Sequence, residues 1–280
     1  MRRAGVTDDA QYAAGLTGML NTTINAPGRY FFSPYDMSLQ APFVDAATSV
    51  DPQNRANTFI SYYTWGAAIG LGLDLSIRSR FPGLALDDFM RAMWQTFGVH
   101  EADYTPQRPY TMDDLRVTLG TVVRDTAFAN DFFRRYINGR EVVDYTSLVG
   151  LAGILLRPAQ PGLPDIGAAQ LEVRDGVVRT AGPVLVGSSL YAAGVSAGDR
   201  IIALDGQPVS TAEAVQGIVA GKRPGEPIGI RFEQRGVERT ASVTVGEIDA
   251  LEVVLYEDAG MDVTPVMREF RASWLGTKSQ

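Results

Sequence analysis

Two adjacent tyrosines at the start of an apolar, glycine-rich stretch are the residues of this chain best suited to chemistry. Tyr62 and Tyr63 lie in the segment 60–66, which opens a predicted helix. A phenol aimed into a cleft is a hydrogen-bond donor for a developing oxyanion. The alternative is that both rings are ordinary aromatics at the edge of a core, with their hydroxyls bonded to neighbouring groups. The spacing alone leaves both interpretations open.

Residues for metal or nucleophilic chemistry are scarce. The chain has no cysteine and one histidine, His100, which follows a predicted helix end. A histidine there is typically a surface residue or a partner of the helix dipole. A catalytic zinc site draws on several histidines, or on histidines with a carboxylate, and a Ser-His-Asp triad needs its base beside a nucleophile. We therefore expect no metal site and no bound cofactor in this chain.

The charge and hydropathy patterns exclude further classes. The formal net charge is −7, so no excess of cations is present to neutralise nucleic-acid phosphates or to bind an anionic membrane. The longest apolar run, residues 59–77, is interrupted by Asp74 and predicts a buried helix, not a membrane span. No apolar stretch follows the basic residues at the N-terminus, so no signal peptide is predicted. A periplasmic and a cytoplasmic location fit equally well.

The first half of the chain has the periodicity of helices. Helix starts are predicted where capping residues precede apolar residues at helical spacing: at Thr7, Ser33, Thr111 and either Asp144 or Thr146. A further helix is predicted to begin with Asp87 and Asp88. The central helix is predicted over residues 57–80 and contains Gly66, Gly70 and Gly72. Glycine lowers helix propensity, so we expect these positions to serve the close approach of neighbouring backbones.

The pattern changes at residues 157–167, a stretch rich in proline and glycine that predicts a linker. Beyond it, alternating apolar runs flank Asp-Gly turns at 175–176 and 205–206 and a turn at Gly236. Further strands are predicted over 183–186 and 251–256, and helices over 211–219 and from Thr264. The fold class is thus α+β, with a helical subdomain over 1–156, a β domain over 157–248 and a strand–helix tail over 249–280.

The segment 187–209 resembles a PDZ domain. Its order of motifs is Gly-Ser, then Ala-Gly, then Gly-Asp, then an apolar strand that ends at Gly206. Ser189 replaces the usual proline and Val195 the usual leucine. PDZ domains bind extended peptides by adding a strand to the edge of a sheet. The resemblance therefore implies that a peptide is the partner of this domain.

The peptide-binding residues of a PDZ domain are placed by the same resemblance. Residues 165–168 are the candidate carboxylate-binding loop, which includes Ile166, Gly167 and Ala168, and residues 169–173 are the groove strand, with Leu171 and Val173. The usual Gly-Leu-Gly-Phe is absent from this loop. Alternatively, the C-terminal tail, including residues 251–256, already covers this strand edge.

The helical half together with the PDZ-like half resembles the glycyl-aminopeptidase family of PDZ-containing zinc metallopeptidases. The matching segments are residues 1–4 with Tyr12, 25–29, 61–66, 73–78 and 273–276. Related gluzincin aminopeptidases carry a Tyr-x-Lys-Gly motif whose tyrosine donates to the transition state. Tyr63 falls on that tyrosine, whereas Trp65 stands in place of the lysine. The resemblance implies that Tyr63 is the catalytic residue and that Tyr62 is the second choice.

The zinc chemistry of this family uses His-Glu-x-x-His and a downstream glutamate. That motif is absent here, and in the family it lies upstream of the segment at which this chain begins. We therefore expect the chain to be the C-terminal portion of a longer metallo-aminopeptidase that acts on short peptides with small N-terminal residues. Zinc then belongs to the longer protein, and this portion alone is inactive.

Two other functions compete with this interpretation. The chain is alternatively a non-enzymatic peptide-binding or scaffold module built on its PDZ domain, and the coding sequence upstream of Met1 would decide between the two. A PDZ-bearing serine protease fits poorly, because such enzymes place a β-barrel with a histidine before the PDZ domain, and this half is predicted to be helical.

Overall fold

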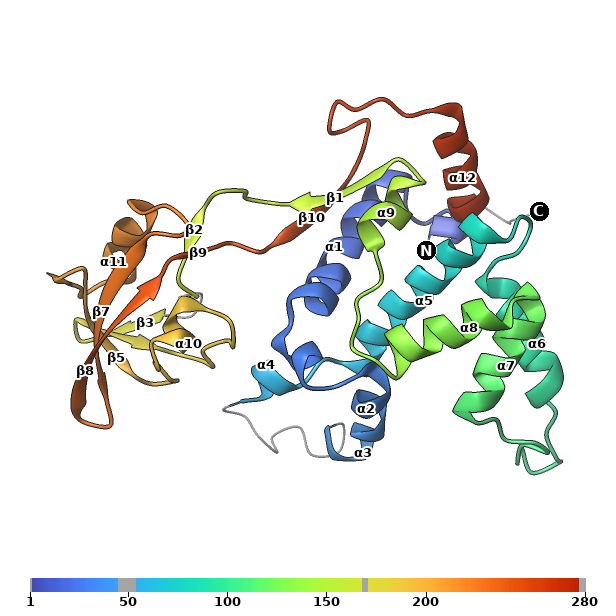
Figure 1. Cartoon of the computed structure of the whole chain (residues 1–280), viewed down its shortest axis with the longest axis horizontal. Coiled ribbons are helices and arrows are strands. Elements are labelled where there is room, and N and C mark those ends of the chain that lie inside the picture. The colour runs from blue at the N-terminus through green and yellow to red at the C-terminus, as the bar shows by residue number, and fades with distance from the viewer. Residues whose placement is uncertain (1, 45–53, 168–170, 277–280) are drawn as a thin grey trace.

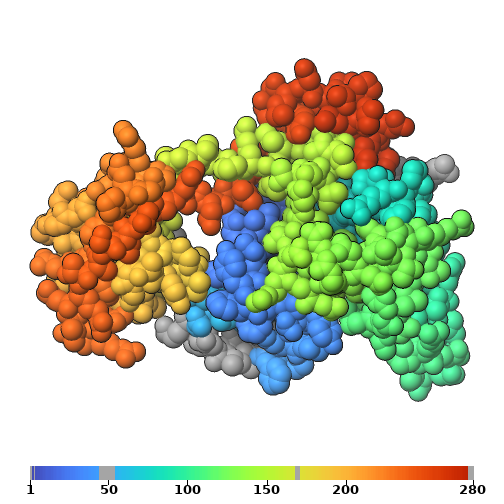
Figure 2. Space-filling view, viewed as in Figure 1, coloured from blue at the N-terminus to red at the C-terminus, as the bar shows by residue number. Residues whose placement is uncertain are grey.

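The computed structural model describes residues 2–44, 54–167 and 171–276, which form two lobes. We call residues 164–247 the β lobe and the other described residues the helical lobe. Figure 1 shows the two lobes joined by a pair of strands, and Figure 2 shows two masses with that strand pair bridging them along one side. The architecture is α+β, as the sequence predicts.

Short and long helices follow one another through the helical lobe, and none in the described part of the chain has the length and apolarity needed to cross a membrane. In chain order they are η1 (Arg2–Ala4), α1 (Asp9–Asn25), η2 (Pro27–Tyr30), α2 (Pro34–Leu39), α3 (Ala41–Val44), α4 (Arg55–Thr58), α5 (Tyr62–Arg80), α6 (Leu86–Phe97), α7 (Met112–Val123), α8 (Thr126–Phe132), the π-helical turn η3 (Phe133–Ile137), α9 (Tyr145–Gly150) and α12 (Pro265–Leu275).

Most of the predicted helix starts are confirmed. Ser33, Thr111 and Asp144 are the N-caps of α2, α7 and α9, and each side chain accepts a hydrogen bond from the first turn. Helix α1 begins one residue later than predicted, because Asp8 is its N-cap and accepts from the Gln11 backbone N–H at 2.7 Å.

The central helix also begins later than predicted. Helix α5 starts at Tyr62, so the predicted start at residue 57 is wrong. The reason is Phe59, which is extended and separates α5 from the one-turn helix α4. This break sets the two candidate tyrosines at the first two positions of α5.

The β lobe is an antiparallel sheet with two helices. Its strands are β2 (Pro164–Asp165), β3 (Leu171–Arg174), β4 (Val177–Thr180), β5 (Arg200–Leu204), β6 (Gln207–Pro208), β7 (Pro227–Gln234), β8 (Val237–Thr244) and β9 (Gly246–Glu247); its helices are α10 (Ser189–Ala192) and α11 (Ala212–Ala220). The main sheet has the order β3-β4-β5-β7-β8, and β2 pairs with β9. The Asp-Gly turns are confirmed, with positive φ at Asp175, Gly176, Asp205 and Gly206.

The strand predicted over residues 183–186 does not form. The Asn57 side chain of α4 bonds to this segment instead, donating to the Val184 carbonyl at 3.0 Å and accepting from the Val186 N–H at 2.8 Å. A side chain of the helical lobe thus takes the place of the strand partner that the segment lacks.

The C-terminal segment completes the helical core. Strand β1 (Ile154–Pro158) pairs antiparallel with β10 (Leu251–Leu255), from Ile154 opposite Leu255 to Pro158 opposite Leu251. Val253, Leu255, Trp274 and Leu275 are buried in the same apolar cluster as α1 and α5. The predicted linker therefore contains the end of β1 and all of β2. The division at 156 and 248 stays a prediction, but these four side chains of the tail are buried against the helices.

A buried guanidinium joins α12 to the turn after α9. Arg271 donates to the carbonyls of Ala152 and Gly153 at 2.7 and 2.8 Å and to the Glu257 carboxylate at 2.8 and 3.0 Å. The hydrogen bond from Arg271 lowers the pKa of Glu257. Gly153 has φ +65°, and a Cβ there would lie 2.8 Å from the guanidinium, so this turn favours glycine.

Truncation of the buried Trp274, only 3% exposed, tests whether the C-terminal helix belongs to the helical core. We expect Trp274→Ala to lower the free energy of unfolding of the helical lobe by ~3–5 kcal/mol, because it leaves a large cavity. The chain's three tryptophans, Trp65, Trp94 and Trp274, all lie in the helical lobe, so fluorescence of the remaining two reports this lobe during denaturant titration.

The matched control is Ile228→Ala, which truncates a fully buried side chain of the β lobe. This variant should leave the tryptophan transition in place. An unchanged fluorescence midpoint in Trp274→Ala would show that α12 is not part of the folded helical core.

Candidate functional site

The two tyrosines at the start of α5 have different surroundings. The side chain of Tyr63 is 73% exposed, whereas Tyr62 is half-buried and packs against a small apolar cluster. The two rings lie 4.5 Å apart between centroids, at an interplanar angle of 37°. Consecutive helical residues point about 100° apart, so only Tyr63 presents its phenol to the open surface.

The start of α5 is held by a cluster separate from the main core. Met37 of α2, Ile60 and Trp65 are its buried members. Gly28 packs against this region so closely that a Cβ would lie 3.0 Å from the Thr58 backbone and 3.2 Å from Ile60 Cγ1. Ala26 packs against the same cluster as Trp65, so the segments 25–29 and 61–66, which carry part of the resemblance, meet in space.

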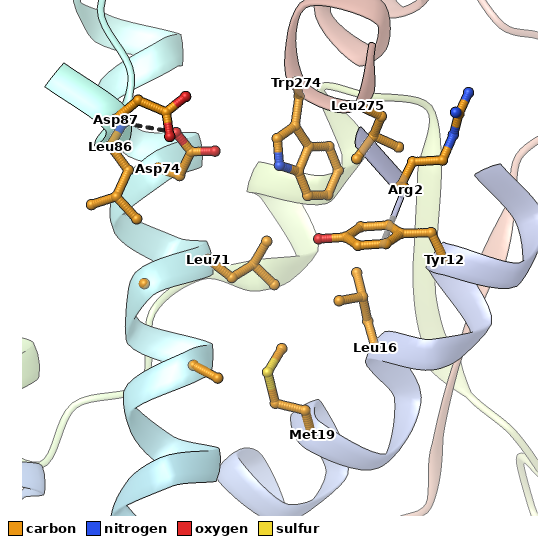
Figure 3. Close-up of a pocket in the computed structure, with 12 residues that line it drawn as sticks. Arg2, Tyr12, Leu16, Met19, Leu71, Asp74, Leu86, Asp87, Trp274 and Leu275 are labelled. Atoms are coloured by element: carbon orange, nitrogen blue, oxygen red, sulfur yellow. Dashed lines mark hydrogen bonds between the residues drawn. The ribbon is translucent and has the colours of Figure 1, made fainter. Parts of the chain in front are cut away.

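The face of α5 that carries Tyr63 continues into a hollow of about 510 Å³. Tyr63, Ala67, Gly70 and Asp74 follow one another at spacings of four, three and four residues, so they share one face of the helix. The hollow is lined by Arg2, Tyr12, Leu16, Met19, Ala67, Gly70, Leu71, Asp74, Leu86, Asp87, Trp274 and Leu275 (Figure 3). Small residues on α5 thus form one wall, and apolar residues of α1 face it.

The glycines of α5 serve two different purposes. Gly72 packs against Val143, where a Cβ would meet a methyl group at 2.9 Å, so the predicted tight packing is confirmed there, although the neighbour is a side chain and not a backbone. It is wrong for Gly66 and Gly70, because a Cβ at Gly66 would meet nothing within 4 Å and one at Gly70 only Leu86 at 3.9 Å. Gly70 keeps the hollow open at its α5 wall.

An ion pair closes the far end of the hollow. The Asp74 carboxylate is buried and accepts from Arg78 Nε at 3.0 Å and from the Leu86 N–H at 2.9 Å. Arg78 Nη1 in turn donates to the Ser273 carbonyl at 2.9 Å. The segments 73–78 and 273–276, far apart in the sequence, are joined here.

His100 lies away from both candidate sites. Its ring is in an exposed loop after α6, with Nδ1 2.8 Å from the Glu101 carbonyl and a centroid 5.1 Å from that of Tyr104. In residues 2–44, 54–167 and 171–276, no three His, Cys, Asp or Glu side chains gather in a group that could hold a metal ion.

The candidate peptide-binding loop of the β lobe is only partly open. Ile166 is 1% exposed and belongs to the apolar core of this lobe, and its carbonyl accepts from the Leu190 N–H at 2.9 Å. Its side chain therefore cannot contact a peptide in this arrangement. Gly167 has φ +79°, and a Cβ there would lie 2.3 Å from Ser188 Cβ, so the loop passes directly over Ser188. Ala168 lies outside the described residues.

The predicted groove strand is the edge of the main sheet. Strand β3 pairs with β4 on one side, and among the described residues no strand pairs with its other side. Leu171 is half-buried and Val173 is 45% exposed. The two-residue turn at 175–176 makes Arg174–Val177 a hydrogen-bonded pair, so the N–H groups of Leu171 and Val173 point to the outer edge. The tail strand β10 pairs with β1 and does not cover this edge.

Helix α11 packs beside this edge strand, and its C-terminal end is anchored. Lys222, just after the helix, forms an ion pair with Asp205, which also accepts from the Gly229 N–H at 2.7 Å. The hydrogen bond from Lys222 lowers the pKa of Asp205. These contacts tie α11 to the turn after β5.

Comparison with known families follows the same division of the chain. Residues 1–69 match the M61 glycyl aminopeptidase family, and residues 164–245 match the PDZ domain. The chain carries a PDZ domain. The resemblance of its helical part to glycyl aminopeptidases is confirmed over the matched residues, which include Tyr62 and Tyr63. No curated protein sequence matches the chain.

The fold of the chain is similar along its length to that of one solved structure. A crystal structure of an aminopeptidase N family protein from Idiomarina loihiensis covers 98% of this chain with a TM-score of 0.72 at 23% identity. This chain spans 46% of that protein, less than half of its length. A serine endoprotease from Yersinia pestis matches 31% of this chain and 30% of its own at 22% identity, with a TM-score of 0.27. The HtrA3 PDZ domain bound to a phage-derived ligand matches 40% of this chain and 100% of its own at 17% identity, with a TM-score of 0.25.

Sequence reasoning missed Asn57 and the α1 side of the hollow. Asn57 lies in the one-turn helix α4, before the start of α5, and no sequence motif includes it. Only the structure places it against the PDZ domain. Tyr12 and Leu16 are visible in the sequence as a helical stripe, but a stripe does not reveal that part of it borders a hollow.

The chain has few side chains that could bind zinc. We expect the 280-residue chain to retain no stoichiometric zinc after dialysis against a weak chelator, because it has one histidine and no cysteine. Elemental analysis of the dialysed protein measures this. A ratio near one zinc per chain would contradict the expectation, and His100→Ala would then show whether the histidine is a ligand.

Proposed function

We propose that this chain is the helical and PDZ portion of a zinc metallo-aminopeptidase that acts on short peptides with small N-terminal residues. The observation that carries the proposal is the exposed phenol of Tyr63, which lies within the segment that matches the glycyl aminopeptidases and on the helix face that borders the hollow. The activity of the whole protein is part of the proposal, because the chain spans under half of the relative of known structure.

The residues of this chain do not fit a catalytic zinc ion. A zinc site of this kind needs histidine and carboxylate ligands in one cluster, and the chain has a single histidine in an exposed loop. The ligands and the general base would therefore come from outside these residues. On this proposal the chain alone does not hydrolyse peptides.

Tyr63 would act as a hydrogen-bond donor to the oxyanion that forms when the peptide carbonyl is attacked. A fixed donor stabilises the developing charge more than the ground-state carbonyl, so it raises kcat. The rigid support of α5 by Met37, Ile60 and Trp65 favours this role, because a donor that is already in place needs no rearrangement during the reaction. Tyr62 has its ring in the supporting cluster and would contribute by packing.

Trp65 marks a departure from the related motif. The indole is only 3% exposed and packs with Met37 and Ile60, so it anchors the first turn of α5. A lysine at this position would place a positive charge there instead. On this proposal the phenol of Tyr63 acts without a neighbouring cation at that position.

The PDZ domain would bind an extended peptide along β3. Outward-facing N–H groups at Leu171 and Val173 offer main-chain donors, and the absence of a side chain at Gly167 lets the loop pass against Ser188 at the start of the groove. This free edge also favours the second candidate function, a peptide-binding module without enzymatic activity.

The decisive experiment begins with the reading frame upstream of Met1. An in-frame His-Glu-x-x-His there supports the enzyme, and its absence supports the binding module. In the full-length enzyme we expect Tyr63→Phe to lower kcat by roughly a hundredfold or more with little change in KM, because loss of one oxyanion donor costs about 2.7–4 kcal/mol. Steady-state kinetics on aminoacyl substrates measures this.

The matched control is Tyr62→Phe, which removes the neighbouring hydroxyl and should change kcat much less. If Tyr62→Phe were crippled while Tyr63→Phe stayed near wild type, the assignment of the two residues would be reversed. If both variants kept wild-type kcat, the phenols would be structural.

Peptide binding is tested separately on the chain itself. We expect fluorescein-labelled decapeptides with a free apolar C-terminus to bind, and Val173→Pro to weaken binding about tenfold or more, because proline removes one outward-facing N–H. Fluorescence anisotropy gives the Kd. The control is Glu238→Pro, which removes a corresponding outward-facing N–H from β8 at the opposite edge of the sheet. Equal loss in both variants would mean that β3 is not the binding edge.

A further inference from the structure

Asn57 connects the two lobes through a buried pair of hydrogen bonds. Its side chain is 4% exposed, donates from Nδ2 to the Val184 carbonyl at 3.0 Å and accepts at Oδ1 from the Val186 N–H at 2.8 Å. Both polar ends of the amide are therefore used on one short segment of the PDZ domain. In Figure 1, α4 lies at the edge of the helical lobe that faces this domain.

The segment held by Asn57 leads within a few residues to Ser188 and Leu190, which contact the candidate peptide-binding loop. The Ser188 hydroxyl donates to the Leu185 carbonyl at 2.8 Å, and the Leu190 N–H donates to the Ile166 carbonyl at 2.9 Å. Between these contacts, Gly167 lies so close to Ser188 that even a methyl group at Gly167 would overlap Ser188 Cβ at 2.3 Å. Any shift of the Ile166–Gly167 loop toward Ser188 must therefore move residues 184–190.

On the helical side, Asn57 lies five residues before Tyr62. The next residues, Thr58 and Ile60, pack against Gly28 with almost no free space. Ile60 is 1% exposed and shares its cluster with Trp65, which lies in the first turn of α5. A displacement of Asn57 therefore reaches a tightly packed region that supports the Tyr63 end of the helix.

We propose that Asn57 is a positioning residue that couples the Ile166–Gly167 loop of the PDZ domain to the first turn of α5. This regulatory role rests on the proposed function, in which that loop receives a peptide and Tyr63 serves the reaction. A peptide that reorders the loop changes the contact at residues 184–186, and Asn57 passes the change to residues 58–63. By the reciprocity of coupled equilibria, order at the start of α5 changes peptide affinity by the same factor.

The coupling is tested without any peptide by disturbing the loop itself. Hydrogen exchange, followed by mass spectrometry, is compared in the wild-type chain, Gly167→Ala, Asn57→Ala and the double variant. We expect Gly167→Ala to speed exchange of the amides in residues 54–65 by about threefold or more over wild type. The same loop change should have no added effect on these amides when Asn57 is already alanine, because the connection is then cut.

Two controls separate coupling from general loosening. Gly236→Ala imposes the same kind of strain at positive φ, with φ +78° and open space around it, in the turn between β7 and β8. It should leave residues 54–65 unchanged. Asn21→Ala removes an equivalent amide pair, made with both backbone groups of Leu251 at 2.7 Å, and should not abolish the effect of Gly167→Ala.

The outcomes distinguish this inference from the proposed function. Unchanged exchange at 54–65 in Gly167→Ala, or an undiminished effect in the double variant, overturns the coupling whatever the enzyme does. Wild-type kcat in full-length Tyr63→Phe overturns the catalytic role proposed for Tyr63, absence of aminopeptidase activity in the full-length protein overturns the proposed function, and both leave the exchange result standing. If Gly167→Ala unfolds the PDZ domain, Ser188→Ala replaces it, because it loosens the same segment by removing the hydroxyl bond from Ser188 to the Leu185 carbonyl. Unchanged exchange in that variant likewise overturns the coupling.

Discussion

The fold depends on how the backbone N–H and C=O groups on the outer edge of β10 find hydrogen-bond partners. One side of this strand pairs with β1, and the other side lies against α1, where Thr17, Asn21 and Asn25 bond to the backbone of Val253, Leu251 and Asp249. Four residues of helix advance about 6 Å and two residues of strand about 6.8 Å, so a polar stripe at spacing four matches a strand edge at spacing two. A helix thereby closes an edge that would otherwise be open to pairing with another chain.

This edge contact determines how the PDZ domain is attached. Because β1 and β10 are paired, the chain leaves and re-enters the helical lobe at one point, and β2 pairs with β9 where it reaches the PDZ domain. A paired tether is stiffer than a single linker, since bending it disturbs the interstrand hydrogen bonds. Such a tether still permits rotation about its own axis, and the Asn57 contact supplies a second point of attachment that opposes this rotation.

The local elements of this fold could be predicted from the sequence, and their long-range partners could not. Capping residues such as Thr111 and Asp-Gly turns such as Asp205–Gly206 act within four residues, so they are legible in the sequence. The sequence predicts the start of α5 too early, because the pattern of apolar residues continues through Phe59. The backbone at Phe59 is extended, and the next residue, Ile60, is buried. The strand predicted over 183–186 has a strand-like composition, but its partner is a side chain 127 residues away.

The candidate site divides in the same way. The tyrosine pair stands out in the sequence at a predicted helix start, but the choice of Tyr63 over Tyr62 rests on the family resemblance. That Tyr63 is the exposed one depends on the cluster against which Tyr62 packs, which the sequence does not reveal. The hollow beside it depends on the distance between α1, α5, α6 and α12, which no local pattern encodes. Ile166 illustrates the same limit, since its place in the predicted loop says nothing of burial, whereas its side chain fills the PDZ core.

Two asparagines show why such contacts escape a reading of the sequence. Asn21 and Asn57 each offer one donor and one acceptor to one carbonyl and one N–H of an extended segment. A side-chain amide carries the same two groups as a peptide unit, so it can replace one link of a neighbouring strand without a strand being present. Asparagine is ordinarily read as a turn or capping residue, because local hydrogen bonds are the ones that sequence spacing reveals. In this fold Asn21 closes the edge of β10 against α1, and Asn57 holds the extended segment 184–186 of the β lobe to the helical lobe with the same pair of groups.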